Sequence, residues 1–300
     1  MKRLDRRGFI TNAATSVAGI VLPRRASVNR ASYIAQSEYS IIEQVRKFQL
    51  LDAYCTADPK MDDAKKFGIE QMFTGKPMIW SKWTPDEFIQ ANDDMLALMK
   101  KYPNQVIGQI SINPHYQKES LEEIDRCADL GMVGSRLYYQ VKINDPLYFP
   151  IIEKFIDLNM IIFMHGEAQI GVGGYRMKYD VGRPFTISTP EDFVDAAVRY
   201  PEGMFQFAHI GGGGDWEYMC KAFREHPNIY VDTGGSNNAG GMIDFAVEYL
   251  GEDRIFFGTD NSYYQGVGKI LAADLTDRQK QKIFFDNYNR VLTKGGYNMD

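Results

Sequence analysis

Short apolar, β-prone runs alternate with longer amphipathic segments from residue 47 onward, which is the pattern of repeated strand and helix units. The helical segments begin with recognisable caps, because TPDEF at 84–88 and TPEDF at 189–193 each place a threonine before a proline and an acidic residue. Eight runs predict strands: KFQLLDAYC (47–55), IEQMFTG (69–75), QVIGQISI (105–112), VGSRLYYQ (133–140), MIIFMHG (160–166), MFQFAHIG (204–211), IYVDTG (229–234) and RIFFGTD (254–260).

Eight strands, each followed by a helical segment, predict an α/β fold in which residues 47–300 form a single (β/α)₈ TIM-like barrel. A doubly wound open sheet is the competing architecture. It is less favoured because no glycine-rich phosphate loop opens the first helix. In a barrel the carboxyl ends of all strands surround one mouth, so polar residues at those ends become candidates for chemistry.

The first 23 residues, MKRLDRRGFITNAATSVAGIVLP, follow a different pattern, with a basic start, the Arg6–Arg7 pair and an uncharged stretch up to Pro23. This pattern predicts a cleavable twin-arginine-type export signal, and therefore a periplasmic or otherwise extracytoplasmic protein. The uncharged stretch is shorter and more polar than the about 20 apolar residues that cross a bilayer, so we expect no membrane span in the mature protein. Residues 24–46 are interpreted as a linker and N-terminal segment.

Composition narrows the function classes. The 34 basic and 39 acidic residues are interspersed and give a net charge of −5, without the basic stripe that follows a phosphate backbone, so nucleic acid is not an expected partner. The three cysteines are widely spaced and imply no disulfide framework. A small-molecule substrate at the barrel mouth is the expected partner.

Three strand ends carry residues typical of catalysis. His165 ends the fifth predicted strand, His209 the sixth and Asp260 the eighth, and in a closed barrel all three would point into one mouth. The chain has only four histidines, and these two stand in equivalent positions, each followed within two residues by glycine. This arrangement favours function over core packing.

Four further residues suggest how a substrate would be held. Arg136, inside the fourth predicted strand, suits bidentate contact with a substrate carboxylate, and equally a structural ion pair. Tyr138 and Trp83 could form flat aromatic walls, or simply pack the core. Gly212, in the glycine run 211–214, marks either an anion pocket or a tight turn.

The motifs GMVGSRLYY, IIFMHGE, STPEDFVDAAVRYPEGMFQFAHIGG, HPNIYVDTGG, RIFFGTDN and DNYNRVL follow one another between about residue 48 and residue 292. In order and spacing this series resembles the amidohydrolase-2 (amidohydrolase-related) family of the metal-dependent hydrolase superfamily. The resemblance implies a distorted barrel whose members hydrolyse amides or lactones, hydrate, or decarboxylate aromatic and unsaturated acids, commonly around one divalent metal such as zinc. Members of that family are often dimers, so the resemblance also implies a possible homodimer.

In those relatives the first strand ends in Asp-x-His-x-His, whose two histidines bind the metal together with a fifth-strand histidine and an eighth-strand aspartate. Here Asp52 matches the opening acid, but Tyr54 and Thr56 replace the two histidines. Of the four metal ligands that the resemblance implies, His165 and Asp260 are the two that remain. A catalytic zinc usually has three protein ligands, so a zinc or manganese site would need one more.

His209 is the candidate for that third ligand, although the resemblance gives it the separate task of polarising substrate or moving a proton. Without a metal, Tyr54 could donate a hydrogen bond to an oxyanion while His209 or Asp260 acts as general base. Three hypotheses follow: a hydrolase or decarboxylase acting on a small organic acid, lactone or amide; a metal-independent hydrolase on the same scaffold; and a degenerate barrel that binds a sugar or an aromatic acid without turnover.

Overall fold

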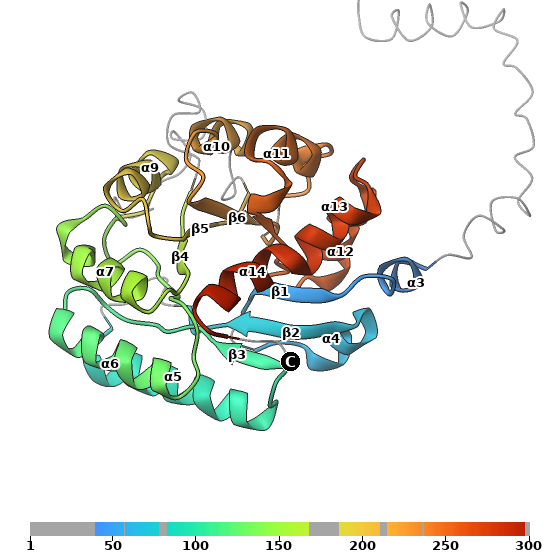
Figure 1. The fold of residues 1–300 in the computed structure, drawn as a ribbon. Helices are drawn as coiled ribbons and strands as arrows, with labels where there is room; N and C mark the ends of the chain where they lie inside the picture. The colour runs from blue at the N-terminus through green and yellow to red at the C-terminus, as the bar shows by residue number, and fades with distance from the viewer. Residues whose placement is uncertain are drawn as a thin grey trace, which may run out of the picture. The chain divides into compact units, whose positions relative to one another are not determined.

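Short parallel strands form the centre of the unit that spans residues 41–300 (Figure 1). The computed structural model describes residues 40–56, 58–77, 83–167, 186–210, 215–235 and 237–297. Within these ranges the strands are β1 (Leu50–Cys55), β2 (Ile69–Thr74), β3 (Val106–Gly108), β4 (Ile162–His165), β5 (Phe205–Ala208), β6 (Ile229–Asp232) and β7 (Ile255–Phe256).

The strands pair in two parallel sheets, β1-β2-β3 and β4-β5-β6-β7. The gap between them is filled by the segment 133–140, which makes only single bridges, from Ser135 to Ile110 and from Leu137 to Met164. The fourth predicted strand therefore lies where a barrel strand would lie, but it is not a regular strand. Its backbone leaves the extended region at Gly134, where φ is +74°, and a Cβ there would lie 2.6 Å from the Ile161 side chain and 2.8 Å from its carbonyl oxygen, so the position suits glycine.

Three backbone hydrogen bonds close the sheet between its first and last strands. The Ala53 N–H donates to the Phe257 carbonyl at 2.8 Å, and the N–H groups of Thr259 and Asp260 both donate to the Tyr54 carbonyl at 3.0 Å. Closure brings the carboxyl end of β1 next to the segment that follows β7. The predicted TIM-like barrel is confirmed, with its eighth-strand residue Asp260 beside its first-strand residue Tyr54.

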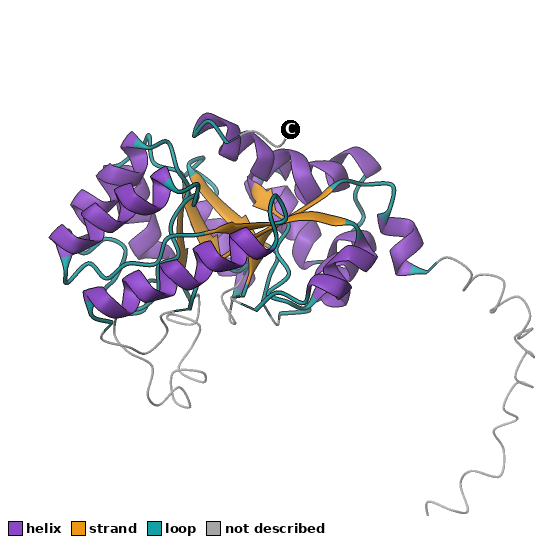
Figure 2. Cartoon of the chain, turned by 90° about the horizontal axis from the view of Figure 1, so that it is seen from below, coloured by secondary structure: helices purple, strands orange, loops and turns teal. Residues whose placement is uncertain are grey.

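Helices cover the outside of the strands (Figures 1 and 2). The capping chemistry predicted from sequence is present, since the N–H groups of Thr84, Thr189 and Thr276 donate to the side chains of Glu87, Asp192 and Gln279 at 2.8, 2.8 and 3.0 Å. The helical elements are α3 (Ile41–Val45), α4 (Met61–Phe67), α5 (Pro85–Lys101), α6 (Gln117–Asp129), η1 (Pro146–Tyr148), α7 (Phe149–Asp157), α9 (Pro190–Arg199), α10 (Trp216–Phe223), α11 (Met242–Leu250), η2 (Glu252–Arg254), α12 (Tyr263–Ala272), α13 (Asp277–Gln281), the π-helical η3 (Lys282–Asp286) and α14 (Asn287–Lys294).

Strand residues on both faces are buried, which is typical of a parallel sheet covered by helices. Cys55, Cys127 and Cys220 are buried free thiols, consistent with the absence of a predicted disulfide framework. In the described ranges we find no helix with the length and apolar character that crossing a membrane requires. The predicted signal, residues 1–23, lies outside those ranges, so export remains a prediction, as does the homodimer.

Candidate active site

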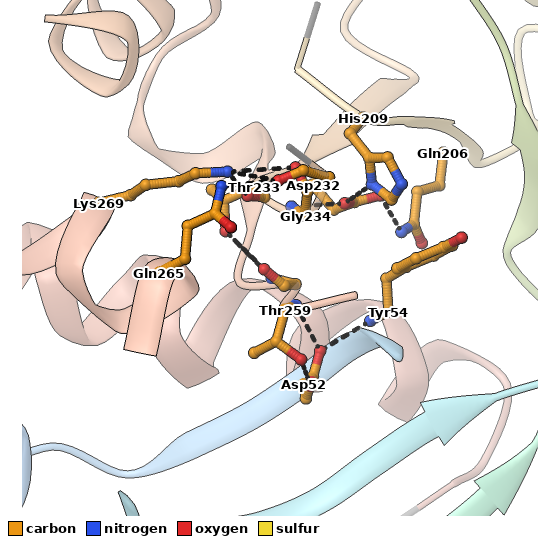
Figure 3. Close-up of polar contacts among 12 residues, drawn as sticks. Asp52, Tyr54, Gln206, His209, Asp232, Thr233, Gly234, Thr259, Gln265 and Lys269 are labelled. Atoms are coloured by element: carbon orange, nitrogen blue, oxygen red, sulfur yellow. Dashed lines mark hydrogen bonds and ion pairs between the residues drawn. The ribbon is translucent and has the colours of Figure 1, made fainter. Parts of the chain in front are cut away.

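A buried histidine–aspartate pair lies at the carboxyl ends of β5 and β6 (Figure 3). His209 Nδ1 is 2.5 Å from Asp232 Oδ1, and the exposed fraction of Asp232 is 0%. The Asp232 carboxylate also accepts from the Gln206 side chain at 3.0 Å and from the Gly234 N–H at 2.9 Å. With Asp232 accepting at every contact, the proton of the imidazole lies on Nδ1, which leaves Nε2 as the nitrogen that can take a proton.

Two glycines and a tyrosine ring pack around the His209 imidazole. A Cβ at Gly234 would lie 2.7 Å from Nδ1, and a Cβ at Gly235 would lie 2.8 Å from Cδ2, so only glycine lets the backbone approach the ring this closely. The Tyr54 ring meets the imidazole edge to face, with centroids 4.2 Å apart. The orientation of His209 is therefore set by contacts on several sides as well as by Asp232.

His165, at the end of β4, is the second histidine of the mouth. Its ring centroid lies 5.4 Å from that of His209, at an interplanar angle of 88°. His165 Nδ1 is 2.5 Å from the Tyr139 hydroxyl, and the ring stacks on Tyr138 at 5.7 Å. The structure thus brings the two predicted histidines together and gives each its own orienting partner.

Tyr54 stands at the first of the two replaced histidine positions. Its ring is 3% exposed and stacks on Phe163 at 5.2 Å, and its hydroxyl lies 3.4 Å from that of Tyr138. Burial raises the pKa of Tyr54 well above its usual value, so the phenol is neutral and keeps a proton to donate. This geometry is compatible both with the space-filling role and with the hydrogen-bonding role that the sequence left open.

Arg136 lies inside the barrel with a fully buried side chain. Its guanidinium carbon is 3.9 Å from the Tyr54 ring centroid and 4.8 Å from that of Phe163, and Nη1 donates to Gln109 Oε1 at 3.2 Å. Across the described ranges no carboxylate lies within ion-pair distance of it, and Nε and Nη2 have no hydrogen-bond partner there. Among the described residues, therefore, cation–π contacts and not an ion pair hold this charge. Contact with a substrate carboxylate remains a prediction.

Asp260 follows β7 at the rim of the mouth, with a left-handed backbone at φ +50°. Burial raises the pKa of its carboxyl group, while the neighbouring His209 and the Arg136 guanidinium act in the opposite direction. Its side chain makes no hydrogen bond to the described residues. Asp260 is thus a second acid–base candidate near His209, as the sequence predicted.

Asp52, the acid that opens the first-strand motif, is buried below the mouth. Its Oδ1 accepts from the N–H groups of Tyr54 at 3.1 Å and Thr259 at 3.0 Å, and its Oδ2 accepts from the Thr259 hydroxyl. Burial raises the pKa of Asp52 to about 8, although these hydrogen bonds lower it. Asp52 joins β1 to the segment after β7, so its role is to hold the barrel closed.

The side chains at the mouth do not fit the one-metal site that the family resemblance implies. The Thr56 hydroxyl, at the second replaced position, accepts from the Asn261 amide, and the Tyr54 hydroxyl faces Tyr138. In the part of the chain that the structure describes, no three His, Cys, Asp or Glu side chains are grouped closely enough to hold a metal ion. The predicted ligand roles of His165, His209 and Asp260 stay predictions, and no chemical step is derived from them.

Trp83 and Gly212 are the remaining predicted substrate contacts. Trp83 lies just before α5 and packs against the aromatic cluster of Phe88, Tyr138 and Tyr139, which connects it to the wall beside His165. Gly212 lies outside the described residues. The substrate contacts of Trp83 and Gly212 both stay predictions.

Sequence reasoning missed two orienting residues. Asp232 was not among the predicted site residues, although it lies near the end of the predicted strand IYVDTG. Tyr139, next to the predicted wall residue Tyr138, was not predicted as a site residue either, but its hydroxyl hydrogen-bonds His165. The signal for Asp232 was its position near a strand end, followed by Thr233 and two glycines. No comparable signal distinguishes Tyr139 from Tyr138.

Residues 55–293 match the model of a protein family described as "Amidohydrolase". The chain belongs to this amidohydrolase family of enzymes. Among solved structures, it is similar to 2,6-dihydroxybenzoate decarboxylase from Rhizobium, with a TM-score of 0.66, 16% identity, and coverage of 82% of this chain and 98% of that one. It is also similar to 4-oxalomesaconate hydratase from Rhodopseudomonas palustris, with a TM-score of 0.60, 18% identity, and coverage of 78% and 80%.

A third similar structure is a dihydroxybenzoic acid decarboxylase from Polaromonas sp. JS666 with bound manganese, with a TM-score of 0.64, 16% identity, and coverage of 82% of this chain and 96% of that one. At these identities the likeness shows a shared fold. The family assignment made from the strand-end motifs is confirmed. A divalent metal is thus present in a structural neighbour of this amidohydrolase.

Proposed function

We propose that this amidohydrolase hydrolyses a small organic acid, lactone or amide by acid–base catalysis at the barrel mouth, without a metal ion. The observation that carries the proposal is the buried His209–Asp232 pair at 2.5 Å, whose Nε2 has no hydrogen-bond partner in the described ranges. A histidine held in this tautomer by a carboxylate is suited to take and return a proton at Nε2.

The reaction follows from the positions of these groups. Nε2 of His209 takes a proton from a water molecule as the water oxygen bonds to the substrate carbonyl carbon, and Asp232 stabilises the imidazolium that forms. The neutral Tyr54 hydroxyl donates to the developing oxyanion. The imidazolium then gives its proton to the leaving oxygen or nitrogen as the carbon–oxygen or carbon–nitrogen bond breaks.

A second candidate reaction, decarboxylation of an aromatic acid, is favoured by the mouth's aromatic walls and by Arg136. The rings of Tyr54, Tyr138 and Tyr139 surround the two histidines, and the buried guanidinium adds a positive charge that attracts an organic anion. Two of the similar structures are decarboxylases of dihydroxybenzoates. Here a protonated histidine would give its proton to the carbon that bears the carboxylate, and the carbon–carbon bond would break to release carbon dioxide.

Metal removal tests the proposal directly. Two probes separate the reactions: dihydrocoumarin, an aromatic lactone, for hydrolysis, and 2,6-dihydroxybenzoate for decarboxylation. We expect protein dialysed against a chelator, and shown by elemental analysis to be free of zinc and manganese, to keep kcat within about twofold, because no step uses a metal.

Purified protein dialysed without chelator is the control, and each sample is assayed again after zinc or manganese is added. A loss of most activity that returns with either metal would show that the mouth assembles a metal site. Failure of the wild-type protein to turn over either probe, combined with tight binding of one of them, would favour a binding barrel over an enzyme.

A further inference from the structure

Lys269 of α12 reaches the backbone segment 233–235, which follows β6 (Figure 3). Its Nζ donates to the carbonyls of Thr233 at 3.0 Å and Gly235 at 2.9 Å, and lies 3.4 Å from that of Gly234. An ammonium group has three donors, so one side chain can hold these three consecutive carbonyls in a fixed order. Gln265, one turn earlier on α12, donates to the Gly235 carbonyl as well, at 3.2 Å.

The segment that Lys269 holds is the one that packs on His209. The positions where Gly234 and Gly235 would carry a Cβ lie 2.7 and 2.8 Å from atoms of the imidazole ring. The Gly234 N–H also donates to Asp232 Oδ1, the same oxygen that bonds His209 Nδ1. The segment therefore touches both the ring and the carboxylate, and any shift of its carbonyls moves both contacts.

A purely structural anchor would not require a charge at this place. Burial lowers the pKa of Lys269 to about 8, while the negative charges of Asp232 and Asp260 act in the opposite direction. In the described ranges Lys269 makes no ion pair. Its ammonium N–H groups donate to backbone carbonyls instead. Partly burying an ammonium is unfavourable unless its hydrogen bonds and charge are used.

We propose that Lys269 is a positioning residue for His209: its ammonium fixes the carbonyls of residues 233–235, and the glycine backbone between them fixes the imidazole against Asp232. The inference rests on the proposed function, in which His209 Nε2 moves the proton. Lys269 touches neither substrate nor the reacting atoms, so it affects the reaction only by setting the orientation of the His209 imidazole.

The test is Lys269→Met, with Lys280→Met as the matched control, because Lys280 is also a partly buried lysine that donates to a carbonyl, that of Leu271 at 3.1 Å, away from the mouth. Two measurements are made on the full chain: the proton resonance of His209 Nδ1 in isotope-labelled protein, assigned with His209→Gln, and the kinetics of dihydrocoumarin hydrolysis. We expect K269M to shift or broaden the Nδ1 resonance and to lower kcat about 10- to 100-fold with KM within about threefold.

K280M should leave both readouts unchanged, and Lys269→Arg should recover part of the loss. If K269M does not fold, Gly235→Ala replaces it, because its methyl group must displace the ring or the segment; Gly240→Ala is its control, since a Cβ there meets nothing within 4 Å. A folded K269M with the wild-type Nδ1 resonance and kcat would overturn the proposal. Because the resonance needs no turnover, an inactive wild-type protein would defeat the proposed function and still leave this inference testable.

Discussion

Asp232→Asn is expected to lower kcat for dihydrocoumarin hydrolysis about 10³-fold while leaving the fold intact. The carboxylate accepts from Nδ1 of His209 at 2.5 Å, whereas an amide can present its NH₂ group to that nitrogen. The imidazole would then carry its proton on Nε2 and could not accept another there. Steady-state kinetics, together with circular dichroism to check folding, measure the effect.

Two controls make this result specific. His209→Gln should cost about as much as D232N, since both remove the same proton acceptor, and the double variant should cost little more than either single one. Gln206→Ala, which removes only one supporting hydrogen bond of Asp232, should give a much smaller loss. Additive losses of D232N and His209→Gln would show that the two residues do not act as a unit.

Asp52→Ala is expected to lower the free energy of unfolding by about 2–4 kcal/mol, because the Tyr54 N–H and the Thr259 hydroxyl lose their acceptor inside the barrel and the Thr259 N–H keeps only the Tyr54 carbonyl. Asp52→Asn should be far milder at neutral pH. Its amide oxygen can keep the two backbone N–H groups that now bond Oδ1, and its NH₂ group can donate to the Thr259 hydroxyl. Urea unfolding of the three proteins, followed by tryptophan fluorescence, provides the comparison.

The pH dependence of the same experiment tests the protonation of Asp52. Its pKa is about 8 in the folded protein against 3.8 ordinarily, so the folded state keeps a proton that the unfolded state has released. The stabilisation is complete below about pH 4 and is lost as the pH rises through about 8. We therefore expect the stability of wild type relative to D52N to fall between these values, and a flat difference would contradict the raised pKa.

The sequence predicted the barrel because hydrophobic periodicity reports burial directly. Each apolar run became a strand or its equivalent, and the residues predicted to end strands meet at one mouth. The exception is 133–140, a β-prone run predicted on the same pattern as the others, and such a pattern cannot show that Gly134 adopts φ +74°. A short β-prone run can thus lie in the right place and still make only isolated bridges.

The candidate site was predicted less completely than the fold. His165, His209 and Asp260 follow from their strand-end positions, but hydrogen-bond partners depend on distances between elements far apart in the chain. The pairing of His209 with Asp232 spans 23 residues, and that of His165 with Tyr139 spans 26. Lys269 had no sequence signal at all, since an amphipathic helix normally carries lysines that face solvent.

The buried guanidinium of Arg136 gives this barrel a positive charge that does not depend on a bound ion. One structural neighbour holds a bound manganese ion, and a bound ion has to be acquired after synthesis and can exchange. The guanidinium carbon of Arg136 instead lies 3.9 Å from the ring centroid of Tyr54, and its charge belongs to the polypeptide itself. Every folded copy therefore carries the same charge at its centre, whatever the metal supply of its surroundings.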